Sequence, residues 1–133
     1  MTPEEDALGF LQLCADKRYH RKTMEAFEAA TALTGPDRYW IEATAGGAVA
    51  FAEPTLTARF AYDNGARTMG WAAHGDGCGG FPGRSDADMQ EMLEAAAREL
   101  LAEFPDADHW LLFGQGGRVE VSPLTRSGSS ERA

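Results

Sequence analysis

The sequence is poor in basic residues and contains no long apolar run. Lys and Arg number 12 against 21 Asp and Glu, so the formal net charge is −9. A surface that binds DNA or RNA needs cationic side chains to displace counterions from the phosphates, and this balance argues against one. The apolar stretches fall far short of the roughly 18 residues that a membrane-spanning helix needs. We therefore expect no direct binding of nucleic acid and no membrane span.

Cysteine is also scarce. The chain has only Cys14 and Cys78, and no pair of metal ligands has the C-x-x-C spacing of a zinc knuckle. Residues 1–6 are acidic, whereas a secretory signal begins basic and continues apolar, so we expect a cytoplasmic protein. Two free thiols are the default state in a reducing compartment, and a Cys14–Cys78 disulfide is the alternative that the count leaves open.

What the sequence does contain is typical of one globular domain. Its 133 residues are 44% hydrophobic and 25% charged, which is enough apolar side chain for a core without metals or disulfides. Residues 125–133 have no large apolar side chain. The prediction is a single α+β domain over residues 1–124, followed by a disordered tail.

Local patterns predict an antiparallel sheet packed by helices. Apolar residues at helical spacing indicate helices over residues 2–15, 21–34 and 85–104. Alternating or short apolar runs indicate strands at residues 38–45, 48–53, 56–62, 66–73, 109–113 and 118–122. Turns at Gly46-Gly47 and Asn64-Gly65 leave no room for a crossover, so the strands between residues 38 and 73 should be antiparallel. The expected fold class is α+β, in the order α-α-β-β-β-β-α-β-β, with about five or six strands and the helices packed on one face.

Three side chains that can bind a metal lie two residues apart in a glycine-rich loop: His74, Asp76 and Cys78. In an extended segment such positions face the same way, so all three could reach one ion. A structural zinc site needs four ligands, and the fourth would have to come from His20, His109 or Cys14. The loop also places a thiol near an imidazole base, but the carboxylates around Cys78 disfavour a reactive thiolate. We expect no catalytic residue, no cofactor and no resident metal, with this trio as the candidate ligands if a metal is present.

The glycine density of the same loop suggests another kind of ligand site. Six glycines fall between residues 70 and 83, ahead of a predicted helix. Backbone N–H groups in such loops can cradle phosphates. The stretch His74-Gly75-Asp76-Gly77-Cys78-Gly79 resembles the R/Q-x-x-G-x-G/A loop of GNAT acetyltransferases, with His74 in place of the Arg or Gln. The resemblance implies an acyl-CoA site, and the alternative is a surface loop that only joins sheet to helix.

Negative charge is concentrated near the last predicted helix. Between residues 86 and 108 there are eight acidic residues and a single base, Arg98. Concentrated like charge steers the association of a basic partner, although a solvated helix face is the simpler alternative. An aromatic in the glycine-rich loop, Phe81, could anchor such a partner. The candidate partner-binding residues are Asp86, Asp88, Glu91, Glu94, Glu99, Glu103 and Phe81.

These features lead to two hypotheses about function. The first is a small acidic binding protein that inhibits or neutralises a basic protein partner, such as a nuclease or another nucleic-acid-handling complex, in the manner of immunity or anti-defence proteins. The alternative is a small-molecule-binding enzyme that uses the glycine-rich loop, such as a GNAT-like acyltransferase. The sequence leaves the oligomeric state open.

Overall fold

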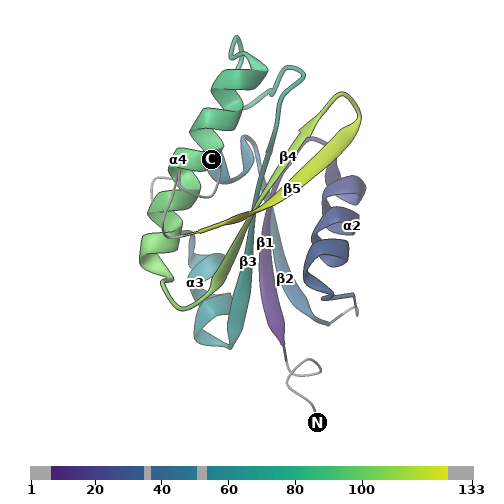
Figure 1. The fold of residues 1–133 in the computed structure, drawn as a ribbon. Helices are drawn as coiled ribbons and strands as arrows, with labels where there is room; N and C mark the ends of the chain where they lie inside the picture. The colour runs from purple at the N-terminus through teal and green to yellow at the C-terminus, as the bar shows by residue number, and fades with distance from the viewer. Residues whose placement is uncertain (1–6, 35–36, 51–53, 126–133) are drawn as a thin grey trace.

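A computed structural model describes residues 7–34, 37–50 and 54–125, which form one sheet with helices on both sides (Figure 1). The first described element is a strand, and helices and strands then alternate up to a C-terminal hairpin. In chain order the described elements are β1 (Leu8–Cys14), α2 (His20–Thr31), β2 (Tyr39–Thr44), the 3₁₀ helix η1 (Gly47–Ala50), α3 (Leu56–Asp63), β3 (Ala66–His74), α4 (Asp86–Glu103), β4 (Asp108–Gln115) and β5 (Arg118–Leu124).

The five strands lie in the order β2-β1-β3-β4-β5. β1 is parallel to both of its neighbours, β2 and β3, and β3 is parallel to β4. Only β5 is antiparallel, because it returns from β4 through a tight turn at Gly116-Gly117, where both glycines have positive φ. The protein is therefore a mixed α/β domain with a mainly parallel sheet.

The helices cover the two faces of the sheet separately, with α2 on one side and α3 and α4 on the other (Figure 1). On the α2 face, Phe27 is fully buried in a cluster with Leu11 and Leu112. On the opposite face, Met89 and Leu93 of α4 belong to the larger core cluster. Within the described residues, no helix has the length and apolar character needed to cross a bilayer.

The expected element order, the antiparallel sheet and the one-sided helix layer are wrong. Residues 8–14 form a strand in place of the predicted helix, and apolar side chains of the helices cover this strand on both faces of the sheet. Leu11 and Leu13 face the α2 cluster, whereas Phe10 and Cys14 face the other cluster. A strand buried on both faces has a continuous apolar run and loses the alternation that would identify it. The helical spacing of Leu8, Leu11 and Cys14 is therefore coincidental.

The strands predicted at residues 48–53 and 56–62 are also wrong where the structure describes them. Residues 47–50 form η1, and residues 51–53 lie outside the described part of the chain. α3 begins after Thr55, whose hydroxyl oxygen accepts the N–H of Ala58 and so caps the helix. The helix serves as the crossover between two parallel strands, and Asn64-Gly65 joins it to β3 instead of making a hairpin.

Several elements of the second half are confirmed. The helix predicted over residues 85–104 is α4, and Ser85 caps it by accepting the N–H of Asp88 at 3.1 Å. The helical spacing of this segment predicts a buried stripe of Met89, Leu93, Ala96, Leu100 and Phe104, and all of these are buried except Ala96, whose neighbour Ala97 is buried instead. The second predicted helix, the strands at β2 and β3, and the hairpin of β4 and β5 are confirmed as well. The helix start at residues 2–5 and the tail beyond residue 125 lie outside the described residues.

Candidate metal centre

The candidate site lies where the chain changes direction in the sheet. From the carboxyl end of β1 the chain crosses through α2 to β2, and from the carboxyl end of the adjacent β3 it crosses through α4 to β4 on the other side. In open α/β sheets, ligands bind in the crevice at such a switch point, because the two connections leave in opposite directions. β1 ends at Cys14, and β3 ends at His74.

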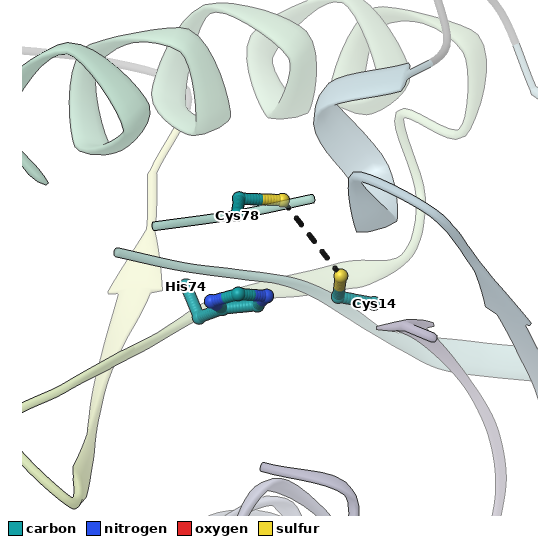
Figure 2. A group of neighbouring side chains, drawn as sticks. All are labelled: Cys14, His74 and Cys78. Carbon is teal, nitrogen blue, oxygen red and sulfur yellow. Dashed lines mark hydrogen bonds between the residues drawn. The ribbon is translucent and has the colours of Figure 1, made fainter. Parts of the chain in front are cut away.

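Three side chains that can bind a metal meet at this point: Cys14, His74 and Cys78. One ligand atom from each lies within 4.8 Å of the other two, and the two Sγ atoms are 4.0 Å apart. In Figure 2, Cys78 lies above the imidazole of His74, and both side chains extend toward Cys14. All three are buried, with exposed fractions of 8% for Cys14, 1% for His74 and 2% for Cys78.

The imidazole of His74 is oriented as a metal ligand would be. Its Nδ1 lies 2.6 Å from the carbonyl oxygen of Gly75, and a carbonyl can only accept, so Nδ1 carries the proton. The other ring nitrogen, Nε2, is buried, makes no hydrogen bond among the described residues and lies 3.4 Å from Oδ2 of Asp16. Metal-binding histidines commonly donate their second ring N–H to a carbonyl in this way. A buried ring nitrogen that makes no hydrogen bond and lies beside two thiols and a carboxylate is placed to bind a metal ion.

The donor set and its spacing fit zinc. Two sulfurs bound tetrahedrally at about 2.3 Å from one zinc ion lie about 3.8 Å apart, close to the 4.0 Å between Cys14 and Cys78. Thiolate and imidazole are the ligands that this ion prefers. Burial raises the pKa of the Cys14 thiol, so a thiolate at this position requires a cation nearby. Three protein ligands with a fourth position open are typical of a catalytic zinc site.

Asp16 lies at the edge of this cluster and is held by Arg18. Its Oδ2 is 3.4 Å from Nε2 of His74 and 2.6 Å from Nη2 of Arg18. The Arg18 hydrogen bonds keep the pKa of the Asp16 carboxyl well below its usual range. Arg18 also donates to the carbonyl oxygens of Asp76 and Gly77, which fixes the pair to the loop that carries Cys78. The carboxylate therefore stays ionised and faces the site.

Asp76, predicted from spacing to face the same way as His74 and Cys78, is not brought together with them. Its carboxylate accepts hydrogen bonds from the hydroxyl of Tyr19 and the N–H of Gly116. Its own N–H donates to the Asp86 carboxylate at 2.8 Å, and its φ is 56°. Asp76 thus joins the loop to α2, to the β4–β5 turn and to the start of α4. Cys14 takes the place that the sequence pattern gave to Asp76.

The other predicted ligands lie elsewhere. His20 has its Nε2 3.0 Å from the carbonyl oxygen of Cys14, so it contacts the backbone of the site but not its centre. His109 is buried near the opposite end of β4, where its ring bonds the indole N–H of Trp71. The start of α4 carries Asp86 and Asp88 in its first turn. The Asp86 carboxylate accepts the N–H of Asp76, so it occupies a backbone donor of the loop that a phosphate group would otherwise use. The acyl-CoA site stays a prediction.

The six acidic residues predicted to bind a partner lie along α4, and Phe81 lies in the loop before it. Four of its acidic side chains are exposed, while Asp86 and Glu94 are half-buried, and Glu94 is paired with Arg98 at 3.0 Å. Phe81 is partly buried and packs against the core. The four exposed residues are Asp88, Glu91, Glu99 and Glu103.

The role of Asp16 was not predicted from the sequence, and Cys14 was predicted only as one of three possible fourth ligands. A cysteine and an aspartate two residues apart directly follow the apolar run of β1, and a strand assignment there would have placed both at the carboxyl edge of the sheet. The chain matches no family model, no curated protein and no solved structure, so the geometry of the site is the basis for its function.

Proposed function

We propose that the protein is a zinc enzyme in which Cys14, His74 and Cys78 hold one zinc ion and water attacks a small electrophilic substrate. The observation that carries this proposal is the convergence of three buried side chains, each of which brings one ligand atom to within 4.8 Å of the other two. A zinc ion with an open position supplies a nucleophile at neutral pH, because it lowers the pKa of water from about 16 to about 7.

The chain's own contribution to the reaction is made by Asp16 and Arg18. Arg18 holds Asp16 with several hydrogen bonds, so the carboxylate is already engaged and the fourth position is left to water. Oδ2 of Asp16 lies 3.4 Å from Nε2 of His74, so the carboxylate is beside the ligand cluster and can accept a hydrogen bond from a water molecule bound there. In this role the carboxylate accepts a hydrogen bond from the nucleophile and orients it, while the proton leaves to solvent, because the low pKa of Asp16 keeps it ionised.

The burial of the site limits the substrate. The three ligands are at most 8% exposed, so only a small molecule can reach them. The acidic chain repels anions at long range, with a net charge of −9. A small, uncharged carbonyl compound, such as carbon dioxide or a short ester, fits both conditions.

Activity should depend on zinc and on Asp16. We expect zinc-loaded protein to hydrate carbon dioxide or to hydrolyse 4-nitrophenyl acetate, a chelator to abolish this activity, and added zinc to restore it. Asp16→Asn should lower kcat by about 10–100-fold, the usual cost of losing a group that orients the reacting partners at a metal site, while zinc stays bound. Asp108→Asn, an exposed aspartate at the start of β4, is the control and should leave kcat unchanged. Wild-type kcat in the Asp16 variant would contradict the proposed role.

A second candidate function, the binding of a basic protein partner, is favoured by a groove between α4 and the β4–β5 hairpin. The groove has a volume of about 460 Å³, and Leu111 and Phe113 of β4 lie in it. Glu91, Glu94 and Glu120 line it from two elements. We propose that it takes a basic amphipathic segment, as the binding site of a nuclease or another nucleic-acid-handling protein would offer.

Charge reversal in the groove tests the second candidate. Glu91→Lys with Glu120→Lys should weaken binding of a peptide of alternating lysine and leucine by at least about tenfold, and more strongly at low salt, where attraction is unscreened. The control, Glu25→Lys with Asp63→Lys, makes the same change in net charge at exposed positions outside the groove. Equal binding of the peptide by both double variants in fluorescence anisotropy would contradict binding in the groove and would mean that its acidic residues only keep the protein soluble.

A further inference from the structure

We propose that Cys14 and Cys78 are also a reversible redox pair: a peroxide oxidises them to a disulfide, and this releases the zinc ion and stops the reaction. The inference concerns the regulation of the site and rests on the proposed function for its zinc-releasing step. The disulfide itself requires only the two thiols.

The geometry places the two sulfurs close to bonding distance. They are 4.0 Å apart although they are 64 residues apart in the sequence. A disulfide needs about 2.05 Å between the sulfurs, so they must approach by about 2 Å. The chain has only these two cysteines, and both are free, so one chain can form no other disulfide.

The movement can come from the Cys78 side. Cys14 is held in the sheet, where it pairs with Thr44 of β2. Cys78 lies in the connection between β3 and α4, flanked by Gly77 and Gly79. Both glycines are exposed, and a Cβ built at either position would meet no atom within 4 Å. The loop therefore has free space around it on both sides of Cys78.

The chemistry balances with hydrogen peroxide as the oxidant. Each zinc-bound thiolate gives up one electron, and the S–S bond forms. The O–O bond of the peroxide breaks, takes up these two electrons and two protons from solvent, and leaves as two water molecules. Disulfide sulfurs carry no negative charge, so His74 is the one strong ligand that remains of the three, and it cannot hold the ion alone. A thiol reductant with added zinc reverses both steps.

Peroxide treatment of the zinc-loaded, full-length protein tests the inference. We expect titratable thiols to fall from two per chain to none, the mass to fall by two hydrogen atoms, and zinc to appear in solution in step with disulfide formation, as read by a chromogenic chelator. Dithiothreitol and zinc should restore both thiols and activity. Cys78→Ala, the matched control, has one thiol and should never show the loss of two hydrogen atoms.

The outcomes separate this inference from the proposed function. Zinc-loaded protein whose thiols survive peroxide, or gain oxygen atoms without forming the disulfide, would overturn the redox pair and leave the zinc enzyme standing. Protein that purifies without zinc but still loses two hydrogen atoms would support the disulfide and overturn zinc release together with the proposed function.

Discussion

Replacement of His74 by alanine is expected to remove zinc from the protein. The metal content should fall from about one ion per chain to near zero, because two sulfurs without the imidazole no longer complete the ligand set. Loss of a partner that only orients a ligand already costs about 10–100-fold in metal affinity, so loss of a ligand should cost more than about 100-fold. Cys14→Ala, which removes the ligand at the end of β1, should also lower the zinc content to near zero. Elemental analysis of protein purified without chelator measures both.

The control for this prediction is His109, a second buried histidine on the same sheet. Its exposed fraction is 3%, and its ring is hydrogen-bonded to the indole of Trp71. His109→Gln should lower the free energy of unfolding but leave the zinc content unchanged, because His109 lies outside the ligand trio. Stoichiometric zinc in His74→Ala, or its loss in His109→Gln alone, would contradict the assignment of the ligands.

Replacement of Phe27 by alanine is expected to lower the free energy of unfolding by about 3–5 kcal/mol, the usual cost of removing a fully buried aromatic ring. Phe27 is 0% exposed and is the main contact of α2 with the sheet. The sheet has glycines where the ring packs: a Cβ at Gly70 would lie 2.7 Å from Phe27, and Gly9 is also adjacent to the ring. Neither glycine has a side chain that could move into the cavity left by the ring.

Urea unfolding measures the Phe27 effect, with Met24→Ala as the control. Met24 is on the same helix and half-buried, so its truncation should cost less than that of Phe27. A loss below about 1 kcal/mol for Phe27→Ala would mean that α2 does not pack on this face as described.

The fold could be predicted where local signals and burial agree. α4 has a capping serine, Ser85, and one apolar stripe, and the β4–β5 hairpin has glycines at its turn. The first half could not be predicted, because β1 is buried on both faces and gives no alternation, and because the apolar spacing of α3 resembles a strand. The antiparallel topology was predicted because residues 56–62 were assigned as a strand between two tight turns, whereas this segment forms α3 and serves as a crossover.

The candidate site was predicted only in part, because two of its ligands are close in sequence and the third is distant. His74 and Cys78 are close in sequence, so their spacing alone suggested a shared ligand. Cys14 is 64 residues from Cys78 and meets it only because β1 and β3 are parallel neighbours whose carboxyl ends coincide. Backbone conformation also mattered: Asp76 has a φ of 56°, which ends the extended geometry on which the predicted His74–Asp76–Cys78 set depended.

The most direct test of the central claim is X-ray absorption at the zinc edge on protein purified without chelator from zinc-supplied cells. We expect about one zinc per chain, with two sulfur neighbours at about 2.3 Å and one nitrogen at about 2.0–2.1 Å. A chain without zinc, or a zinc ion whose nearest neighbours include no sulfur, would contradict this claim.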